Sequence, residues 1–551
     1  MKTNASDSIQ VQGAVQDYLK GNIGRRTFLR RLSTLGFSAT AAGQFSKLLA
    51  APAASAQDRN VGGASGTIDL LIRGAHVITM NDDRHVYTNG YLAINDGKIV
   101  GVGQDRDCPF QGRETISGSG FVVMPGLINS HNHLIQVASR GRGDDPPSSS
   151  SPPGRQDMKA RMRSLVRGMV MDSVHWDESR TYDVVRLHLL ALLKGGTIAT
   201  HDQHFTNRNK ESIDGVLRAI DESGMRAFVA RGIVNHPDVV PEEAREDPEV
   251  GLQEVKRLRD RWNSSRINVV PSPVAVAYIA SGEDIVKIKR GAEAMGAGFE
   301  MELAGNTGHM VMEEIGWKGG GIEYLDDLGV LDETVLGDKG HLLQDQEYQL
   351  WKDRGMKVCM VPTLRISDGT GLPVDKYLDV GILPGLGTDS MVTPSGLWRV
   401  MRYVVYAQRM RDQRLGLRRP QGLPVYSERV MEMATRGGAW ALFMEDRTGS
   451  LEVGKDGDCI LIDTDRPYLR PDSDARRIVS NLVWSGESDM VDTVIVAGKI
   501  LMRNRECQIW DEEEVVTTAE KAVASLNKDT GADQRLPLRI PGQTVRGWTY
   551  L

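Results

Sequence analysis

Eight short apolar segments alternate with amphipathic helical patterns through the middle of this chain, and this alternation constrains the fold more than any other feature. The apolar segments lie at 121–128, 196–201, 226–234, 267–274, 297–303, 333–338, 356–361 and 382–388. Helical patterns lie at 179–194, 210–223, 249–264, 283–296, 344–354 and 427–436. Strands that alternate with helices form parallel sheets, and eight such units close into a barrel. The pattern therefore predicts an α/β chain with a (β/α)8 TIM barrel over residues 125–445.

The two flanks of this region carry β patterns instead. They lie at 67–75 and 91–102 before the barrel and at 450–463 and 492–503 after it. Asn95-Asp96-Gly97 predicts a tight hairpin turn within the second pattern, because glycine readily adopts a positive φ. We expect both flanks to build one composite β-sandwich from residues 57–124 and 446–510. A C-terminal helix at 512–527 and a polar tail would occupy residues 511–551.

The first 56 residues have the features of an export signal. Gly24-Arg25-Arg26-Thr27-Phe28-Leu29-Arg30 resembles the twin-arginine motif, an apolar stretch follows, and Ala54-Ser55-Ala56 resembles a cleavage site. An arginine-rich amphipathic helix is the alternative, but the three features occur in the order that an export signal requires. We therefore expect the twin-arginine export machinery as a partner and a periplasmic or secreted location.

Composition excludes several partner classes. The formal net charge is −6, so no basic field favours nucleic acid. No run of about 18 apolar residues is present, which predicts no transmembrane helix and no membrane association after export. A small-molecule substrate is the expected partner of the barrel. Ser148 to Pro153 predicts a loop over the barrel mouth, either a mobile lid or a disordered insertion.

One motif at the first barrel strand carries the chemistry. Met124-Pro125-Gly126-Leu127-Ile128-Asn129-Ser130-His131-Asn132-His133 is an apolar strand that ends in His-x-His. Alternate residues of a strand point the same way, so His131 and His133 can project together into the barrel mouth. Two neutral imidazoles are a natural start for a divalent metal site.

With this motif, the sequence resembles the amidohydrolase superfamily, in the branch of cytosine and 8-oxoguanine deaminases and triazine chlorohydrolases. The opening Asp69-Leu70-Leu71-Ile72-Arg73-Gly74-Ala75 also carries the resemblance, as do Gly385-Leu386-Gly387-Thr388-Asp389-Ser390 and Gly449-Ser450-Leu451-Glu452-Val453-Gly454. The resemblance implies a distorted TIM barrel with a composite β-sandwich and one divalent metal ion. It implies His131, His133 and Asp389 as ligands, with Asp389 orienting or deprotonating water. By analogy with the family, a homo-oligomer is also expected.

The chain departs from the family pattern at three strands. Glu302 occupies the strand-5 ligand position, and Gly305 replaces the glutamate that shuttles protons in deaminases. At strand 6, Asp338 occupies the ligand position, while His341 matches a second histidine that is usually not a ligand; we keep it as a catalytic candidate. Arg365 follows strand 7, where the family has a neutral polar residue.

These departures change the expected metal chemistry. A site of His131, His133, Glu302, Asp338 and Asp389 is rich in carboxylates, and negative ligands leave bound water less acidic. Oxygen-rich ligand sets favour Mn or Fe relative to Zn, so the identity of the ion stays open among Zn, Mn and Fe. Glu302, Asp338 and Asp389 are also candidate acid/base groups.

Other residues near the barrel mouth are candidates for substrate binding. Gln136, His201, His204 and Arg365 form this set. Each has a structural alternative: a loop hydrogen bond for Gln136, a replacement ligand or hydrogen bond for the two histidines, and neutralisation of acidic groups for Arg365. Lys339 directly follows Asp338, which predicts that its side chain faces away from the pocket. Trp176 and Phe205 are expected in the core, with an aromatic pocket wall as the alternative.

Three functions fit these residues. The first is metal-dependent hydrolysis of a carbon–nitrogen, non-peptide bond in a small cyclic substrate. The second is a lyase or isomerase in which clustered carboxylates with divergent pKa values act as acid and base. The third is an inactive ligand-binding pseudoenzyme, because a fold alone does not establish catalysis.

Overall fold

The computed structural model describes residues 66–140, 171–205, 207–275, 280–303, 312–313, 315–367, 369–389, 396–419, 422, 424–471 and 475–532. The described residues from Thr67 onward belong to one compact unit of the chain. The predicted export signal at 1–56, the Ser148–Pro153 loop, Gly305 and the predicted tail after residue 532 lie outside these ranges. Among the described helices, none is both long and apolar enough to cross a membrane.

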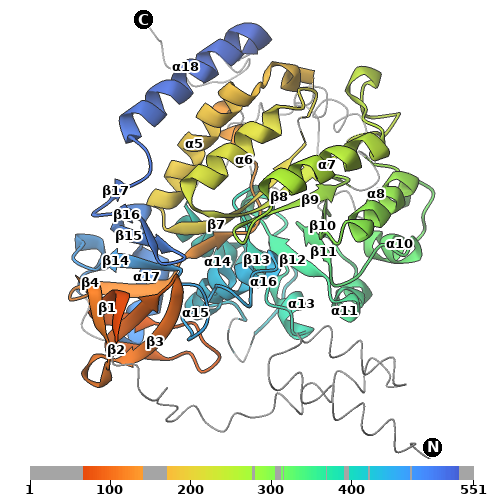
Figure 1. The fold of residues 1–551 in the computed structure, drawn as a ribbon. Helices are drawn as coiled ribbons and strands as arrows, with labels where there is room; N and C mark the ends of the chain where they lie inside the picture. The colour runs from red at the N-terminus through yellow and green to blue at the C-terminus, as the bar shows by residue number, and fades with distance from the viewer. Residues whose placement is uncertain are drawn as a thin grey trace, which may run out of the picture. The chain divides into compact units, whose positions relative to one another are not determined.

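An eight-stranded parallel sheet forms the predicted barrel, which is confirmed (Figure 1). Its strands are β6 (Leu127–Asn129), β7 (Thr197–His204), β8 (Arg226–Gly232), β9 (Ile267–Ser272), β10 (Phe299–Glu302), β11 (Val335–Asp338), β12 (Lys357–Met360) and β13 (Gly385–Leu386). The β13–β6 pair joins the two ends of the series at Leu386 and Asn129. Between β9 and β10, the closing contact is a bridge from Ala275 to Glu302. The barrel is therefore distorted where β10 meets β9.

Helices surround this barrel, as expected for strands that are buried on both faces. The larger ones are α5 (Glu178–Lys194), α6 (Ser212–Ser223), α7 (Pro248–Trp262), α8 (Gly282–Ala294), α11 (Asp345–Arg354) and α14 (Leu397–Arg414). Shorter ones are α10 (Gly321–Asp327), α12 (Pro362–Ser367), α13 (Val374–Asp379), α15 (Ser427–Glu432) and α16 (Gly438–Ala441). Asp177 caps α5 by accepting from the Arg180 amide, and Asp247 caps α7 in the same way through Glu249.

A second, nine-stranded sheet combines segments from both flanks of the barrel, as predicted, but as one sheet and not as a sandwich of two. Its strands are β1 (Thr67–Ile78), β2 (Val86–Asn95), β3 (Lys98–Gln104), β4 (Gln111–Ser117), β5 (Phe121–Pro125), β14 (Cys459–Asp463), β15 (Val491–Val496), β16 (Lys499–Arg503) and β17 (Glu506–Cys507). Pairing of β5 with β14 joins residues far apart in sequence. Asp96 and Gly97 form the predicted hairpin turn with positive φ values of 49° and 72°.

The predicted strand at 121–128 is two strands in the structure. β5 belongs to the second sheet, and β6 begins the barrel after Gly126. A side chain at Gly126 would collide with Ile198 of β7, since its Cβ would lie 2.3 Å from the isoleucine Cγ2. Glycine therefore lets the chain pass from the sheet domain into the barrel at close range.

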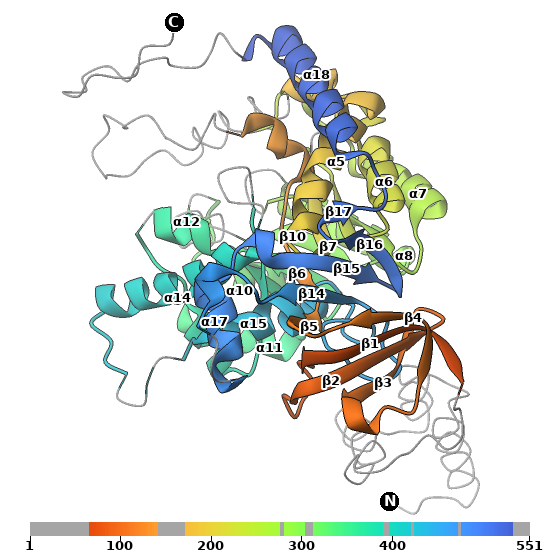
Figure 2. The ribbon, with the colours of Figure 1, turned by 90° about the vertical axis from the view of Figure 1, so that its left-hand side faces the viewer.

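The C-terminal helix α18 (Glu512–Thr530) lies along α5, and both views agree on this placement (Figures 1 and 2). Arg180 of α5 binds Asp529 at 2.7 Å and Ser525 at 3.0 Å. Val184 of α5 and Ala522 of α18 share a small apolar cluster with Val137, which follows His133 in the chain. This packing brings the end of the chain close to the His-x-His loop.

Candidate active site

The His-x-His loop and the segment after β13 lie side by side at the barrel mouth. The amides of Thr388 and Asp389 both donate to the carbonyl of His131 at 3.0 Å. This approach needs glycine at position 387, because a Cβ there would lie 2.6 Å from the Cβ of His131. The backbone of Gly385-Leu386-Gly387-Thr388-Asp389 therefore places the Asp389 carboxylate against the two imidazoles.

Three acceptor-capable atoms converge on one point of this site. The Nε2 atoms of His131 and His133 lie 3.5 Å and 3.3 Å from Asp389 Oδ1. His133 binds the carbonyl of Gln203 through Nδ1 at 2.9 Å, so Nδ1 carries its proton. The Nε2 of a neutral His133 then presents a lone pair to a carboxylate oxygen, which requires a proton or a metal cation between them.

The spacing of these atoms suits one divalent ion. Ligand atoms at ~2.1 Å from a common ion lie ~3.0–3.5 Å from one another, and the distances of Asp389 Oδ1 from the Nε2 atoms of His131 and His133 fall in this range. Glu302 is within reach, because ligand atoms of His131, His133 and Glu302 all lie within 4.8 Å of one another. Among the described residues, His131 Nε2 has no hydrogen-bond partner. The residues present therefore fit a metal ion.

Asp338 lies on the other side of His131. Its Oδ2 is hydrogen-bonded to His131 Nδ1 at 2.7 Å and lies 3.4 Å from His201 Nδ1. Asp338 thus contacts the nitrogen of His131 that faces away from Asp389. His131, His201 and Asp338 form a second group with the spacing of metal ligands, so the two groups share one imidazole.

A second buried carboxylate, Glu300, interacts with Asp338. Gln203 donates to Glu300 at 2.9 Å. Burial raises the pKa of Glu300 to about 7, and burial together with the charge of Glu300 raises the pKa of Asp338 well above its usual range. Sequence reasoning did not single out Glu300, although strand alternation places it on the same face of β10 as Glu302.

Lys339 corrects one sequence expectation. Its side chain does not face away: Nζ lies 3.1 Å from Glu302 Oε1 and 3.1 Å from Asp389 Oδ2. The backbone at Lys339 has a φ of +58°, so the alternation of an extended strand does not continue through it. Burial alone would lower the pKa of Lys339, but the charges of Asp389 and Glu302 raise it. Lys339 is therefore a buried ammonium inside the site.

Left-handed backbone recurs around this point. Asp389 has a φ of +66° and Val274, whose carbonyl accepts from the Glu302 amide, has a φ of +65°. Non-glycine residues in this conformation are uncommon and store strain, and such residues concentrate at functional sites. Val274, Lys339 and Asp389 all have this conformation. They position the Glu302 backbone, the Lys339 ammonium and the Asp389 carboxylate, respectively.

The imidazoles respond to this environment in different directions. Burial, followed by the charge of Lys339, lowers the pKa of His131 to about 4. For His133, burial also opposes the charged form, but the hydrogen bond and charge of Asp389 outweigh it and raise the pKa. The two imidazoles of the motif are therefore electrostatically inequivalent.

The remaining predicted residues lie around this centre with distinct contacts. His341 is buried and accepts from the Val361 amide at 3.2 Å, and burial followed by the charge of Arg365 lowers its pKa well below the usual range. Arg365 is buried in α12. His204 lies 3.3 Å from Ser212 Oγ, and burial lowers its pKa to about 3.

A cavity of about 140 Å³ opens beside His133. Gln136 and Gln203 line it on the polar side, and Trp176 and Phe205 line it with aromatic surface. Both aromatic residues also pack against the main core, and the Phe205 ring meets His133 edge-on at 5.5 Å. Leu526, Asn527 and Thr530 of α18 complete the wall. Sequence reasoning missed this last contribution, because nothing in α18 itself indicates where the helix docks.

The sequence of this chain is similar to those of known enzymes. The model of the amidohydrolase family matches residues 122–501, which is most of the chain. This protein belongs to the amidohydrolase family. Its relatives include a 5-methylthioadenosine/S-adenosylhomocysteine deaminase of Desulforudis audaxviator, 30% identical over 465 residues, which cover 83% of this chain and 99% of the relative. A 5'-deoxyadenosine deaminase of Methanosarcina acetivorans is 30% identical over 474 residues, with 83% and 99% covered.

Solved structures share the fold of this amidohydrolase. The atrazine chlorohydrolase TrzN from Arthrobacter aurescens TC1, complexed with zinc, has a TM-score of 0.71 and 24% identity, and the match covers 82% of this chain and 100% of that one. An adenosine deaminase from Xanthomonas campestris with bound zinc has a TM-score of 0.71 and 22% identity, with 84% and 99% covered.

Proposed function

We propose that this amidohydrolase hydrolyses a carbon–nitrogen, non-peptide bond in a small cyclic substrate, with one divalent ion held by His131, His133 and Asp389. The convergence of the two Nε2 atoms on Asp389 Oδ1 carries the proposal. Curated relatives that are deaminases of 5-methylthioadenosine, S-adenosylhomocysteine and 5'-deoxyadenosine support the reaction class.

The residues of the site have separable tasks in this reaction. When bound, the divalent ion supplies a Lewis acid that makes hydroxide available near neutral pH. Asp389 accepts the proton of the attacking water and passes it to the departing nitrogen, as a general base and then a general acid. His133 is held in one tautomer by the Gln203 carbonyl, which keeps its Nε2 directed at Asp389.

The cavity beside His133 positions the substrate. Trp176 and Phe205 offer flat apolar surface for a ring, while Gln136 and Asn527 offer amide groups that both donate and accept. Its volume of about 140 Å³ suits the ring of a substrate.

Metal content tests this function directly. Protein purified without chelators is expected to hold about one Zn, Mn or Fe per chain, and His131→Ala is expected to lose it, because one of the two imidazole ligands is removed. Plasma mass spectrometry measures the metal. Ammonia release from 5'-deoxyadenosine, 5-methylthioadenosine and S-adenosylhomocysteine measures turnover.

Chelation separates the three functions that the sequence left open. Loss of turnover on chelation, with recovery on adding the metal, is the expected result. Turnover that survives complete removal of metal would contradict the proposal and favour the carboxylate-driven lyase or isomerase. Tight ligand binding without turnover in any metal state would identify a pseudoenzyme.

The role of α18 in the cavity gives a second prediction. Leu526→Trp is expected to raise KM at least about 10-fold with a smaller change in kcat, because the larger side chain fills space beside His133 without touching Asp389. Steady-state kinetics on the best substrate measures both constants. Lys528→Ala, an exposed change two residues further along α18, is the control and should leave KM unchanged. Equal effects of the two changes would show that α18 does not line the substrate site.

A further inference from the structure

Lys339 places a permanent positive charge inside the proposed metal site. Its side chain is 5% exposed and its Nζ contacts Glu302 Oε1 and Asp389 Oδ2, each at 3.1 Å. Burying an ammonium costs free energy unless carboxylates compensate it, and here two of them do. The charge is therefore a built feature of the site.

The oxygen atoms of the site divide between two cations. Asp389 presents Oδ1 to the imidazoles and Oδ2 to the ammonium. Glu302 has a ligand atom within reach of both imidazoles and also pairs with Lys339. The ammonium and a divalent ion would therefore share Asp389 and compete for Glu302.

Backbone structure fixes the ammonium in this place. The Lys339 amide donates to the Cys359 carbonyl at 3.0 Å, which anchors the residue to β12 while its left-handed φ turns the side chain inward. The next residue, Gly340, has no room for a Cβ, which would lie 2.2 Å from the hydroxyl oxygen of Tyr377. The hydrogen bond to Cys359 and the tight packing at Gly340 hold the backbone so that the Lys339 side chain points at Glu302 and Asp389.

We propose that Lys339 is a positioning residue that serves as the fixed second cation of the site. Its ammonium holds Glu302 away from the divalent ion and cancels the charge of that carboxylate, so that His131, His133 and Asp389 alone bind the ion. This inference rests on the proposed function. An ion that faces one carboxylate instead of two remains a stronger Lewis acid, which offsets the carboxylate enrichment of this chain.

Charge compensation tests this role on metal-free protein. Zinc affinity and stoichiometry are measured by competition with a chromophoric chelator for wild type, Lys339→Met, Glu302→Gln and the double variant. Lys339→Met is expected to bind zinc at least about 10-fold more tightly, because a repelling charge is gone and Glu302 is free to bind. The double variant is expected to return to within about 3-fold of wild type, since both charges are removed together.

Thermal unfolding of the same metal-free proteins provides an independent readout. Lys339→Met is expected to lower the midpoint, because two buried carboxylates lose their partner, and Glu302→Gln is expected to restore part of it in the double variant. Lys289→Met is the matched control: Lys289 is equally buried and pairs with Asp332 at 2.7 Å and Glu293 at 2.8 Å on another face. It should lower the midpoint without changing zinc affinity.

Each outcome separates this inference from the function on which it rests. Zinc affinity of Lys339→Met equal to or weaker than wild type would overturn the inference, as would a double variant no more stable than Lys339→Met. Zinc binding by Lys339→Met but not by wild type would support the ammonium's role, and metal-dependent hydrolysis would then fail only if wild type bound neither manganese nor iron. If neither wild type nor any variant binds zinc, manganese or iron, the proposed function fails. The unfolding midpoints then still test whether the Lys339 ammonium compensates the charge of Glu302.

Discussion

Asp389→Asn is expected to lower kcat about 10³-fold, which corresponds to about 4 kcal/mol of transition-state stabilisation. Among the described residues, Asp389 is the carboxylate on which His131, His133 and Lys339 all converge. An asparagine keeps an oxygen for the metal but is a very poor proton acceptor. One equivalent of metal should therefore remain bound while turnover is lost, and KM should change little.

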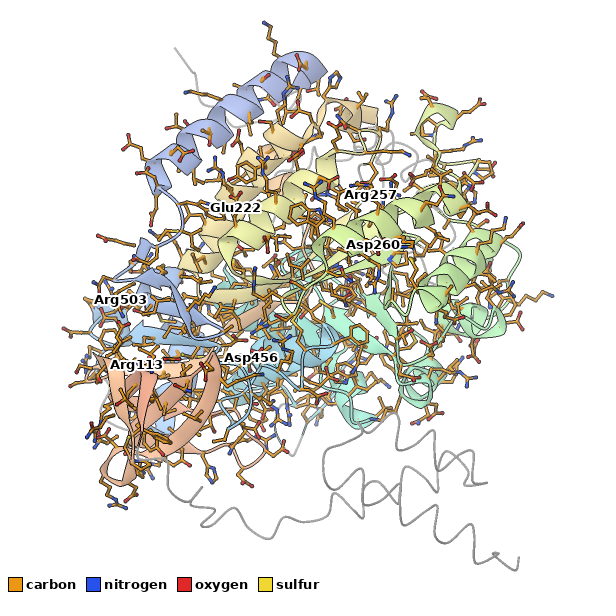
Figure 3. All side chains as sticks on the ribbon, in the orientation of Figure 1. Arg113, Glu222, Arg257, Asp260, Asp456 and Arg503 are labelled. Atoms are coloured by element: carbon orange, nitrogen blue, oxygen red, sulfur yellow. The ribbon has the colours of Figure 1, made fainter. Side chains whose placement is uncertain are left out.

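Single-turnover kinetics and metal analysis on the same preparation measure this result. The control is Asp260→Asn, which makes the same chemical change at an exposed position of α7 (Figure 3). Loss of the metal together with turnover would assign Asp389 mainly to metal binding. Turnover within a factor of about ten of wild type would contradict its role as the base.

Arg226→Met is expected to lower the free energy of unfolding by about 3–5 kcal/mol, the largest effect on stability anticipated here. Arg226 of β8 binds Asp458 through Nε at 2.7 Å and Asp456 through Nη2 at 2.7 Å, and all three side chains are almost fully buried. Asp456 lies where the sheet domain meets the barrel (Figure 3). Removing the guanidinium leaves two buried carboxylates, of which Asp456 retains Lys98 and Arg447 as partners.

Urea unfolding followed by tryptophan fluorescence measures the change. Arg266→Met provides the comparison, because Arg266 also pairs with an aspartate, Asp221 at 2.8 Å, but at the surface. Its expected cost is below about 1 kcal/mol, as for exposed ion pairs. If Arg226→Met and Arg266→Met lowered the free energy of unfolding by similar amounts, burial would not make the Arg226 ion pairs more important for stability than the surface pair of Arg266.

The barrel and the sheet domain could both be predicted from the sequence because each depends on local patterns. Apolar segments of strand length, separated by helical patterns, indicate a parallel barrel wherever they repeat eight times. Asn95-Asp96-Gly97 specifies a hairpin through backbone preferences alone. The division of 121–128 into β5 and β6 was missed, because β5 is defined by pairing with β14, more than three hundred residues later.

The candidate site divides in the same way. His131 and His133 follow from strand alternation, and Asp389 was placed beside them only by family resemblance. Strand alternation failed at Lys339, where a left-handed residue reverses the direction that the sequence predicts. Neither the docking of α18 beside His133 nor the position of Asp338 behind His131 has a local signal.

The sequence by itself determined the barrel, the composite sheet and the two histidines of the His-x-His motif, since local preferences of three to ten residues specify these features. Only the tertiary structure decided which oxygen atoms face the imidazoles, where the Lys339 ammonium lies and which helix closes the cavity. Those outcomes depend on backbone strain at Lys339 and Asp389 and on packing between distant segments. Their energies arise only when the whole unit is assembled, so no short stretch of sequence contains them.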